Sequence, residues 1–279
     1  GPDLIIFVNA HPWNYFISLV FKKKITTVNI IHDVIPHKGD RNEKKVYLYN
    51  KYISRISEYL VVHSKMFIEI LKSEYRINTK KVYHIDLFRE YIDYSEPFPT
   101  KTCLFFGRIN KYKGLNNLIY IVDKNPEVKF MIVGQMEQNA KEEIEKLSKF
   151  SNVEIINKKV NEFEMKKYFI ESEIVILPYE SATQSGVIVD AYKYSRPVIC
   201  FDVGGLAEQV EHKKTGYLIQ NQNLETFSIQ LNSFFQLSAI EKKRISHDAW
   251  EFGYIKYSFQ NSQDRVNSLL EKIKVNKMN

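Results

Sequence analysis

Two basic residues stand close together where proteins often bind phosphate. Arg108 and Lys113 follow the apolar run 103–106 and are flanked by Gly107 and Gly114. Arginine can bind two phosphate oxygens through its planar guanidinium, and lysine adds a compact positive charge. Each such charge-assisted hydrogen bond contributes about 1.5 to 3 kcal/mol. The pattern predicts a site for a doubly charged group such as a diphosphate; two solvated cations on a loop are the alternative interpretation.

A second turn in the same half of the chain favours the diphosphate site. The apolar run 174–177 ends at Pro178, the loop 179–185 is polar, and Ser185 and Gly186 lead into apolar residues at helical spacing. This order predicts a strand, a loop and a helix. A helix N-terminus offers free N–H groups and the positive end of the helix dipole, so it can hold an anion.

The elements that must position these residues alternate along the chain. In the first third, apolar periodicity predicts strands and helices in turn, which is typical of a parallel sheet covered by helices. The segment 89–101 has two prolines and no periodicity, so we expect it to be an interdomain linker. The predicted strands are 4–8, 27–31, 59–62 and 82–85, and the predicted helices are 13–21, 43–56 and 65–75.

A second set of alternating predicted strands and helices occupies the rest of the chain. The predicted fold class is therefore α/β, with two Rossmann-like domains whose parallel sheets face each other across a cleft. We expect an N-terminal domain at 1–98, a C-terminal domain at 99–255, and a last segment at 256–279. In this set the predicted strands are 103–106, 129–133, 153–156, 174–177, 198–201 and 217–219; besides the helix after residue 185, the predicted helices are 114–122, 141–150, 162–169, 207–210, 224–235, 239–250 and 259–273.

Composition and charge narrow the class of protein. The 279 residues carry a net charge of +7, which suits nucleic acid, an anionic membrane surface or a phosphate-bearing substrate. The basic residues are dispersed and no nucleic-acid-binding motif accompanies them, so nucleic acid is not an expected partner. No apolar run reaches the roughly 20 residues of a membrane span. No GxGxxG follows a strand, no metal-ligand cysteine or histidine cluster is present, and Cys103 and Cys200 lie in apolar runs.

Six segments of the second half give a family resemblance. They are FGRINKYKG at 106–114, VGQ at 133–135, VILPY at 175–179, TQSGVIVDAYKYSRPVI at 183–199, DVGGLAEQV at 202–210 and KTGYL at 214–218. In this order the segments resemble the retaining nucleotide-sugar glycosyltransferases of GT-B fold, glycosyltransferase family 4. The first half resembles the family more weakly, through NAHPWN at 9–14, IIHDVIPH at 30–37 and VVHS at 61–64. Family members begin with additional strands, so the resemblance implies a shortened N-terminal domain, which a partner chain could complete.

The resemblance implies roles for particular residues. Arg108 and Lys113 would bind the donor diphosphate, and His32 would face the donor sugar. Ser185 and Gly186 would supply backbone N–H groups to the phosphates. The implied catalytic residues are Arg108, Lys113 and His32; the implied donor-binding residues are Gly107, Gln184, Ser185, Gly186, Asp190, Glu180 and Val160; and the implied acceptor-side residues are His11, Trp13 and His37.

One acidic position departs from the family pattern. The family has two acidic residues separated by seven others, of which the second grips the ribose. Asp190 matches the second, whereas the first falls on Ala182. Glu180 or Gln184 would contact the sugar instead. Val160 would lie near the nucleobase.

The resemblance implies transfer of a sugar from a nucleotide-diphosphate sugar to a saccharide or lipid-linked acceptor. Transfer would retain the anomeric configuration and need no metal and no cofactor beyond the donor. The expected setting is cell-surface polysaccharide or glycolipid synthesis in the cytoplasm, at the inner face of the membrane. Two alternatives remain: a non-catalytic or partner-dependent subunit of a split glycosyltransferase, and a related sugar phosphorylase or epimerase. The terminal helix would pack back across the interdomain region, as in the family.

Overall fold

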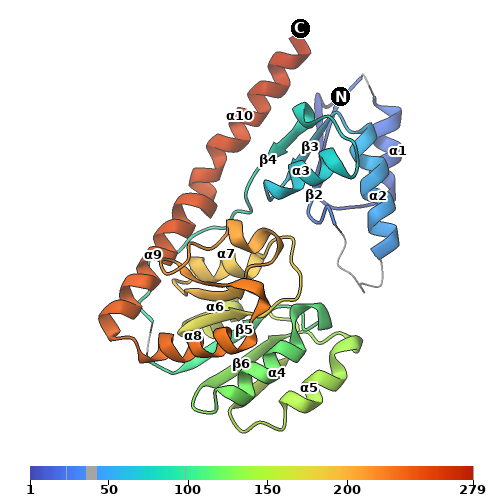
Figure 1. Cartoon of the computed structure of the whole chain (residues 1–279). Helices are drawn as coiled ribbons and strands as arrows, with labels where there is room; N and C mark the ends of the chain where they lie inside the picture. The colour runs from blue at the N-terminus through green and yellow to red at the C-terminus, as the bar shows by residue number, and fades with distance from the viewer. Residues whose placement is uncertain (23, 36–42, 98, 279) are drawn as a thin grey trace. The chain divides into compact units, whose positions relative to one another are not determined.

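The computed structural model describes residues 1–22, 24–35, 43–97 and 99–278. Contacts divide the chain into two units (Figure 1): unit 1 is Gly1–Leu87 with Gln260–Asn279, and unit 2 is Phe88–Phe259. These limits differ from the expected domain limits at 98 and 255. Residues after 87 join unit 2 because they bond to it; for example, the Trp250 indole donates to the Ile92 carbonyl oxygen at 2.9 Å.

Unit 2 is built on a six-stranded sheet in which every pairing is parallel. Its strands are β5 (Thr102–Phe106), β6 (Lys129–Gly134), β7 (Val153–Asn157), β8 (Ile174–Leu177), β9 (Val198–Phe201) and β10 (Gly216–Ile219). Their order is β10-β9-β8-β5-β6-β7. The chain starts at β5, moves outward to β7, and returns to β8 on the other side of β5. The order therefore reverses between β5 and β8, and sheets of this kind bind ligands at such a reversal, outside the carboxyl ends of the strands.

Helices connect these strands and cover the sheet (Figure 1). The α-helices are α4 (Leu115–Lys124), α5 (Lys141–Leu147), α6 (Glu162–Ile170), α7 (Gly186–Lys193), α8 (Leu224–Gln236) and α9 (Ala239–Tyr257). Short 3-10 helices lie at η2 (Lys111–Lys113), η3 (Gln138–Ala140), η4 (Gly204–Glu208) and η5 (Gln220–Gln222). The helix expected at 207–210 is replaced by η4, which begins at Gly204 with φ +53°. A Cβ there would collide with the Ala182 carbonyl oxygen, so this position requires glycine.

The core of unit 2 encloses one arginine. All residues of β8 and β9 are buried, as expected for central parallel strands covered on both faces. Arg196, just before β9, is completely buried. Its guanidinium donates hydrogen bonds to the backbone carbonyl groups of Ser95, Phe169, Ile170, Tyr194 and Ser195. The arginine thereby joins the segment before β5, the end of α6 and the turn after α7.

Unit 1 has a four-stranded parallel sheet in the simple order β1-β2-β3-β4. Its strands are β1 (Leu4–Phe7), β2 (Thr26–Ile31), β3 (Tyr59–Val62) and β4 (Val82–His84). Its helices are α1 (Pro12–Val20), α2 (Glu43–Ile56), α3 (Met66–Ser73), the 3-10 helix η1 (Thr79–Lys81), and all but the first residue of α10 (Phe259–Met278). No reversal of strand order occurs among these four strands.

The terminal helix α10 covers one side of the unit 1 sheet. Leu269 and Ile273 pack with Val28, Val61 and Ile85. A second apolar cluster joins the strands to α2 and α3. The terminal helix expected to pack across the interdomain region therefore contributes Gln260 onward to unit 1.

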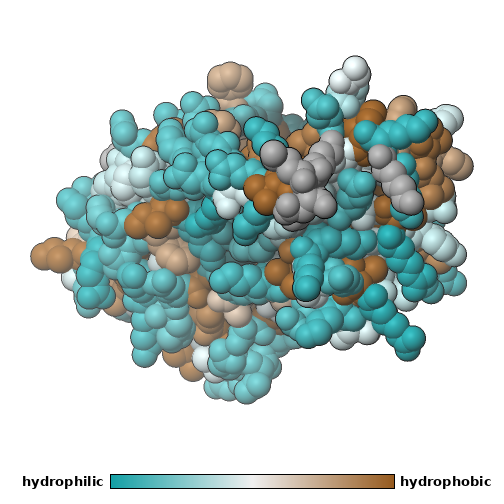
Figure 2. All heavy atoms as spheres, turned by 90° about the horizontal axis from the view of Figure 1, so that it is seen from above, coloured by the Kyte–Doolittle hydropathy of each residue, from teal (hydrophilic) through white to brown (hydrophobic). Residues whose placement is uncertain are grey.

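The surface is mostly hydrophilic on the face drawn in Figure 2, where hydrophobic residues form separate groups. No helix among the described residues combines the length and the apolar composition that a membrane span requires.

Candidate functional site

The loops that follow β5 and β8 are bonded to each other at the reversal of strand order. Gly114 has φ +74°, and a Cβ there would collide with the Pro178 carbonyl oxygen. Asn117 Nδ2 donates to the same oxygen at 2.9 Å. The Glu180 backbone N–H donates to the Tyr112 carbonyl oxygen at 3.2 Å. The two segments expected to bind phosphate therefore form one surface.

The loop after β5 also joins the loops after β6 and β7. Gly107 has φ +101°, and its N–H donates to the Val133 carbonyl oxygen at 3.0 Å. A Cβ on Gly134 would collide with the Gly107 carbonyl oxygen, so the two loops touch through their backbones. Lys158 N–H donates to the Gly134 carbonyl oxygen at 3.2 Å. Val160, expected near the nucleobase, lies half-buried two residues further along this edge.

Lys113 is a buried cation of this edge. Only 8% of the residue is exposed, and Nζ lies 5.1 Å from the centroid of the Tyr179 ring. Nζ would lie 2.9 Å from a Cβ on Gly107, so the ammonium lies over that glycine. No described residue forms a hydrogen bond or an ion pair with Nζ. Burial, and secondly the charge of Arg108, lower the pKa of Lys113 to about 7.

Arg108 adds a second cation close by. Its side chain is exposed, and no ion pair with it is found among the described residues. Lys111, in the same turn, differs because its Nζ lies 2.8 Å from Glu143 Oε1. Two neighbouring cations without an anion repel each other, and a bound dianion would remove this repulsion. The geometry therefore brings together Arg108 and Lys113 as the sequence predicts.

The N-terminus of α7 differs from the prediction at one residue. The Ser185 N–H, expected to bind phosphate, donates to Gln209 Oε1 at 2.7 Å, and Gln209 Nε2 donates to the Ser185 carbonyl oxygen at 3.1 Å. The Ser185 amide is thus engaged within the protein. The helix begins at Gly186 without a side-chain cap, so its first turn supplies the positive dipole end. A glutamine 24 residues away gave no local signal in the sequence.

Asp190 has a partner that the sequence did not predict. Arg89 Nε lies 2.7 Å from Asp190 Oδ1, and Asp190 is 8% exposed. Burial raises the pKa of Asp190, while the charge and hydrogen bond of Arg89 act against this rise. Arg89 lies in a segment without periodicity, where one arginine carries no signal of its own.

The remaining predicted donor residues are less enclosed. Glu180 is exposed and Gln184 is half-buried, so both side chains are accessible beside the loop after β8. Ala182, at the position of the family's first acidic residue, is buried and touches the turn at Gly204 through its carbonyl oxygen.

Unit 1 places two histidines together at the carboxyl ends of its strands. His32 Nε2 donates to the Val8 carbonyl oxygen at 2.8 Å, and His63 Nδ1 donates to the Ile85 carbonyl oxygen at 2.7 Å. Their ring centroids are 5.0 Å apart. Burial lowers the pKa of His63, which favours its neutral form. His63 belongs to the segment VVHS at 61–64 and directly follows a predicted strand, which is a signal of this edge in the sequence.

The expected acceptor-side residues have different surroundings. His11 caps α1, its Nδ1 accepting the Trp13 N–H at 3.3 Å. Trp13 is 64% exposed. Both therefore lie at the start of α1. His37 lies outside the described residues.

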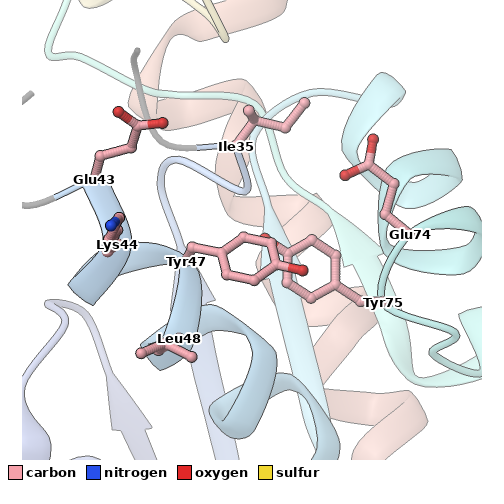
Figure 3. Close-up of a pocket in the computed structure, with 7 residues that line it drawn as sticks. All are labelled: Ile35, Glu43, Lys44, Tyr47, Leu48, Glu74 and Tyr75. Carbon is pink, nitrogen blue, oxygen red and sulfur yellow. The ribbon is translucent and has the colours of Figure 1, made fainter. Parts of the chain in front are cut away.

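Unit 1 also contains a pocket of about 410 Å³ that includes none of the predicted site residues. In Figure 3 the rings of Tyr47 and Tyr75 lie side by side within it, and their centroids are 5.6 Å apart. Tyr75 donates to the Val34 carbonyl oxygen at 2.9 Å. The lining residues are Ile35, Glu43, Lys44, Tyr47, Leu48, Glu74 and Tyr75.

One group of side chains among the described residues has the spacing of metal ligands. His247, Asp248 and Glu251 on α9 have ligand atoms within 4.8 Å of one another. His247 and Glu251 are exposed. The group lies on a helix and not in the loops at the carboxyl ends of the strands.

Comparisons with known proteins place most of unit 2 in a family. The family model described as "Glycosyl transferases group 1" matches residues 93–250. An uncharacterized glycosyltransferase of Haemophilus influenzae is 28% identical over 131 residues, which are 45% of this chain and 36% of that protein.

Two solved structures share the fold. One is S. aureus TarM in complex with UDP and other ligands, with TM-score 0.76, 20% identity, and coverage of 88% of this chain and 51% of that chain. The other is Anabaena HepE in complex with UDP and glucose, with TM-score 0.81 and 15% identity. The match covers 96% of this chain and 77% of that chain. The chain thus spans about half the length of TarM and about a third of the H. influenzae relative.

The family match covers more than half of the chain and includes every predicted donor-site residue of unit 2. The two parallel sheets and the structural similarity agree with it and confirm the predicted α/β class with two parallel-sheet domains. The chain therefore belongs to the group 1 glycosyl transferases and has the GT-B fold.

Proposed function

We propose that this chain transfers a sugar from a nucleotide-diphosphate sugar to a saccharide or lipid-linked acceptor, with retention at the anomeric carbon. The observation that carries the proposal is the buried ammonium of Lys113 beside Arg108, at the reversal of strand order and with no carboxylate partner among the described residues. A diphosphate would supply the missing negative charge. The presence of UDP in the TarM and HepE structures makes UDP the first nucleotide to test.

The proposed reaction relies on charge at the leaving group. As the bond between the anomeric carbon and the diphosphate oxygen breaks, Arg108, Lys113 and the N-terminus of α7 offset the growing negative charge. The acceptor hydroxyl oxygen forms the new bond on the same face. Its proton passes to a phosphate oxygen, and the nucleoside diphosphate leaves. No enzymic nucleophile enters this scheme.

The other predicted residues have roles in the same scheme. Asp190 accepts hydrogen bonds from the ribose, and Val160 lies near the base. Glu180 or Gln184 contacts the sugar. His32 of unit 1 approaches the donor sugar, while His11 and Trp13 serve the acceptor.

Protein cations take the place of a metal in this proposal. Transfer should therefore continue in excess EDTA, whereas loss of activity restored by Mg²⁺ or Mn²⁺ would contradict this part. A role in polysaccharide or glycolipid assembly at the inner face of the membrane is proposed with it. Activity on lipid-linked saccharide acceptors, compared with free sugars, tests that setting.

The first experiment is a titration with UDP, GDP and ADP followed by thermal unfolding. A ligand that binds only the folded protein raises the unfolding temperature, so one nucleotide should stabilise the chain. Arg108→Ala and Lys113→Ala should each weaken binding by about 10-fold to 150-fold, the equivalent of one charge-assisted contact. Lys111→Ala is the matched control, because this lysine lies in the same turn but is paired with Glu143.

The outcome also separates the alternatives. Stabilisation by no nucleotide would contradict the donor site. Binding without turnover, with turnover restored by a partner chain, would support the partner-dependent subunit. The family match does not favour the phosphorylase or epimerase. With turnover in hand, the anomeric configuration of the product, read by NMR, tests retention.

A further inference from the structure

Arg89 is held at the donor site by its backbone. Its N–H donates to the Tyr257 carbonyl oxygen at 2.8 Å, and its carbonyl oxygen accepts the Phe259 N–H at 2.9 Å. The residue pairs with Ser258 in a parallel bridge. All these residues belong to unit 2. The start of the Arg89 side chain is therefore fixed by the end of α9.

The guanidinium of Arg89 spans the first turn of α7. Nε lies 2.7 Å from Asp190 Oδ1, and Nη1 donates to the Phe88 carbonyl oxygen at 3.0 Å. Nη2 lies 3.2 Å from the place of a Cβ on Gly186. A cation beside a helix N-terminus is unfavourable, so the helix dipole does not explain its place. The carboxylate of Asp190 explains the position of the Arg89 guanidinium.

Asp190 needs this partner because it is buried. A buried carboxylate without a counter-charge takes up a proton more easily. Lys193 also acts on Asp190, but its Nζ lies 3.1 Å from Glu162, whose charge opposes it. Arg89 makes the largest contribution that favours the ionised carboxylate.

We propose that Arg89 is a positioning residue that keeps the Asp190 carboxylate ionised and oriented to accept the ribose hydroxyl groups of the donor. This inference rests on the proposed function and adds a specificity: the site should distinguish a ribonucleotide from its 2′-deoxy counterpart through Arg89. A carboxylate fixed at Oδ1 presents its second oxygen in one direction. An aspartate is shorter than the family's glutamate, which makes its orientation more important.

Calorimetric binding of UDP, 2′-deoxy-UDP and inorganic pyrophosphate tests the proposal. The wild-type chain should prefer UDP over 2′-deoxy-UDP by about tenfold, the equivalent of one hydrogen bond. In Arg89→Met this preference should fall to about twofold or less, while the affinity for pyrophosphate stays within about twofold. Asp190→Asn should lose the same preference, and the double variant should lose no more than either single variant, since one residue acts through the other.

Two further variants separate positioning from general structure. Arg89→Lys should recover part of the preference, and Arg244→Met, which removes an exposed arginine of α9, should leave it unchanged. In Arg89→Met the UDP preference should recover partly as pH rises, because Asp190 then loses its proton. Titration of Lys113 should affect the affinities for UDP and 2′-deoxy-UDP equally, because both carry the same diphosphate. It therefore cancels in the ratio of the two affinities. If Arg89→Met fails to fold, the UDP preference of Arg89→Lys and Asp190→Asn tests the proposal.

The results that would overturn the role of Arg89 differ from those that would overturn the proposed function. Equal loss of UDP and pyrophosphate affinity in Arg89→Met would show that Arg89 binds phosphate, and would overturn the positioning role. An unchanged UDP preference would overturn it as well. If the wild-type chain binds none of UDP, GDP, ADP and pyrophosphate, the proposed function fails and this inference with it.

Discussion

Two of the buried cations of unit 2 have opposite surroundings. Arg196 is completely buried, and its guanidinium donates hydrogen bonds to five backbone carbonyl groups. Lys113 is almost as buried, but no described residue forms a hydrogen bond or an ion pair with its ammonium. Burial lowers the pKa of Arg196 to about 10, whereas burial and Arg108 lower the pKa of Lys113 to about 7.

The difference separates a cation whose partners the fold supplies from one that has no hydrogen bond or ion pair with the described residues. A buried charge is unfavourable unless hydrogen bonds or an opposite charge compensate for it. The fold provides these partners for Arg196. For Lys113 they must come from a bound anion or be replaced by loss of the proton. Strongly shifted pKa values in a ligand-binding loop are typical of functional sites.

The largest expected effect is that of Arg196→Met on stability. Several buried carbonyl groups would lose their donor, each at about 1 to 3 kcal/mol, so the free energy of unfolding should fall by about 3 to 5 kcal/mol. Urea unfolding of unit 2 measures this. Arg244→Met, at an exposed arginine of α9, should change it by less than about 0.5 kcal/mol. Equal effects of the two variants would contradict the structural role of Arg196.

The second expected effect is the pH dependence that Lys113 gives to stability. Its pKa is about 7 in the folded protein and near 10.5 when unfolded, so the unfolded chain binds more protons between these values. The free energy of unfolding should therefore rise with pH from 7, by about 1.4 kcal/mol per pH unit at most. In Lys113→Met this contribution should be absent, and the variant should be more stable than wild type at pH 7.

A bound diphosphate should reverse the effect of Lys113→Met, so that the substitution becomes unfavourable. A diphosphate keeps Lys113 protonated, so saturating ligand should flatten the wild-type pH profile, and affinity should weaken as pH rises above 7. Lys113→Met should bind weakly at every pH. Parallel pH profiles of the wild type and Lys113→Met without ligand would show that the lysine has an ordinary pKa, and would remove the contrast with Arg196.

The sequence predicted most of what a local pattern can encode. The limits of α2 and β8 agree with the prediction, because each has an uninterrupted periodic or apolar run between clear breaks. The short helix predicted at 207–210 is instead the 3-10 helix Gly204–Glu208, because a backbone contact with Ala182 fixes the chain at Gly204. Local periodicity contains no information about that contact.

The site was predictable only in part, for the same reason. Arg108 and Lys113 stand out because glycines and a strand surround them. Arg89 and Gln209 do not, since their partners lie 101 and 24 residues away along the chain. The pairing of Asp190 and the use of the Ser185 amide follow from tertiary contacts. Such contacts decide which polar groups remain available to a ligand.

A smaller effect is expected in unit 1, at a half-buried histidine with one hydrogen-bond partner among the described residues. His63 donates through Nδ1, and no described residue is bonded to its buried Nε2. Its pKa lies below 6.5 because of burial. The unfolded chain therefore binds the proton first as pH falls through 6.5, and stability should decrease there. His63→Asn should flatten this part of the profile in urea unfolding between pH 7 and 5. An unchanged slope would assign the decrease to other groups.

The smallest expected effect, that of Lys111→Ala on ligand affinity, is the sharpest test of the contrast. Lys111 has the same side chain as Lys113 and lies two residues away in η2, but its ammonium is 2.8 Å from the buried carboxylate of Glu143. A cation with its own partner has little to offer a ligand, and salt screens what remains. Affinity for the nucleotide should change by less than about threefold at physiological ionic strength. A loss as large as that of Lys113→Ala would mean that charge in this turn matters regardless of pairing, and the absence of a partner would no longer mark the site.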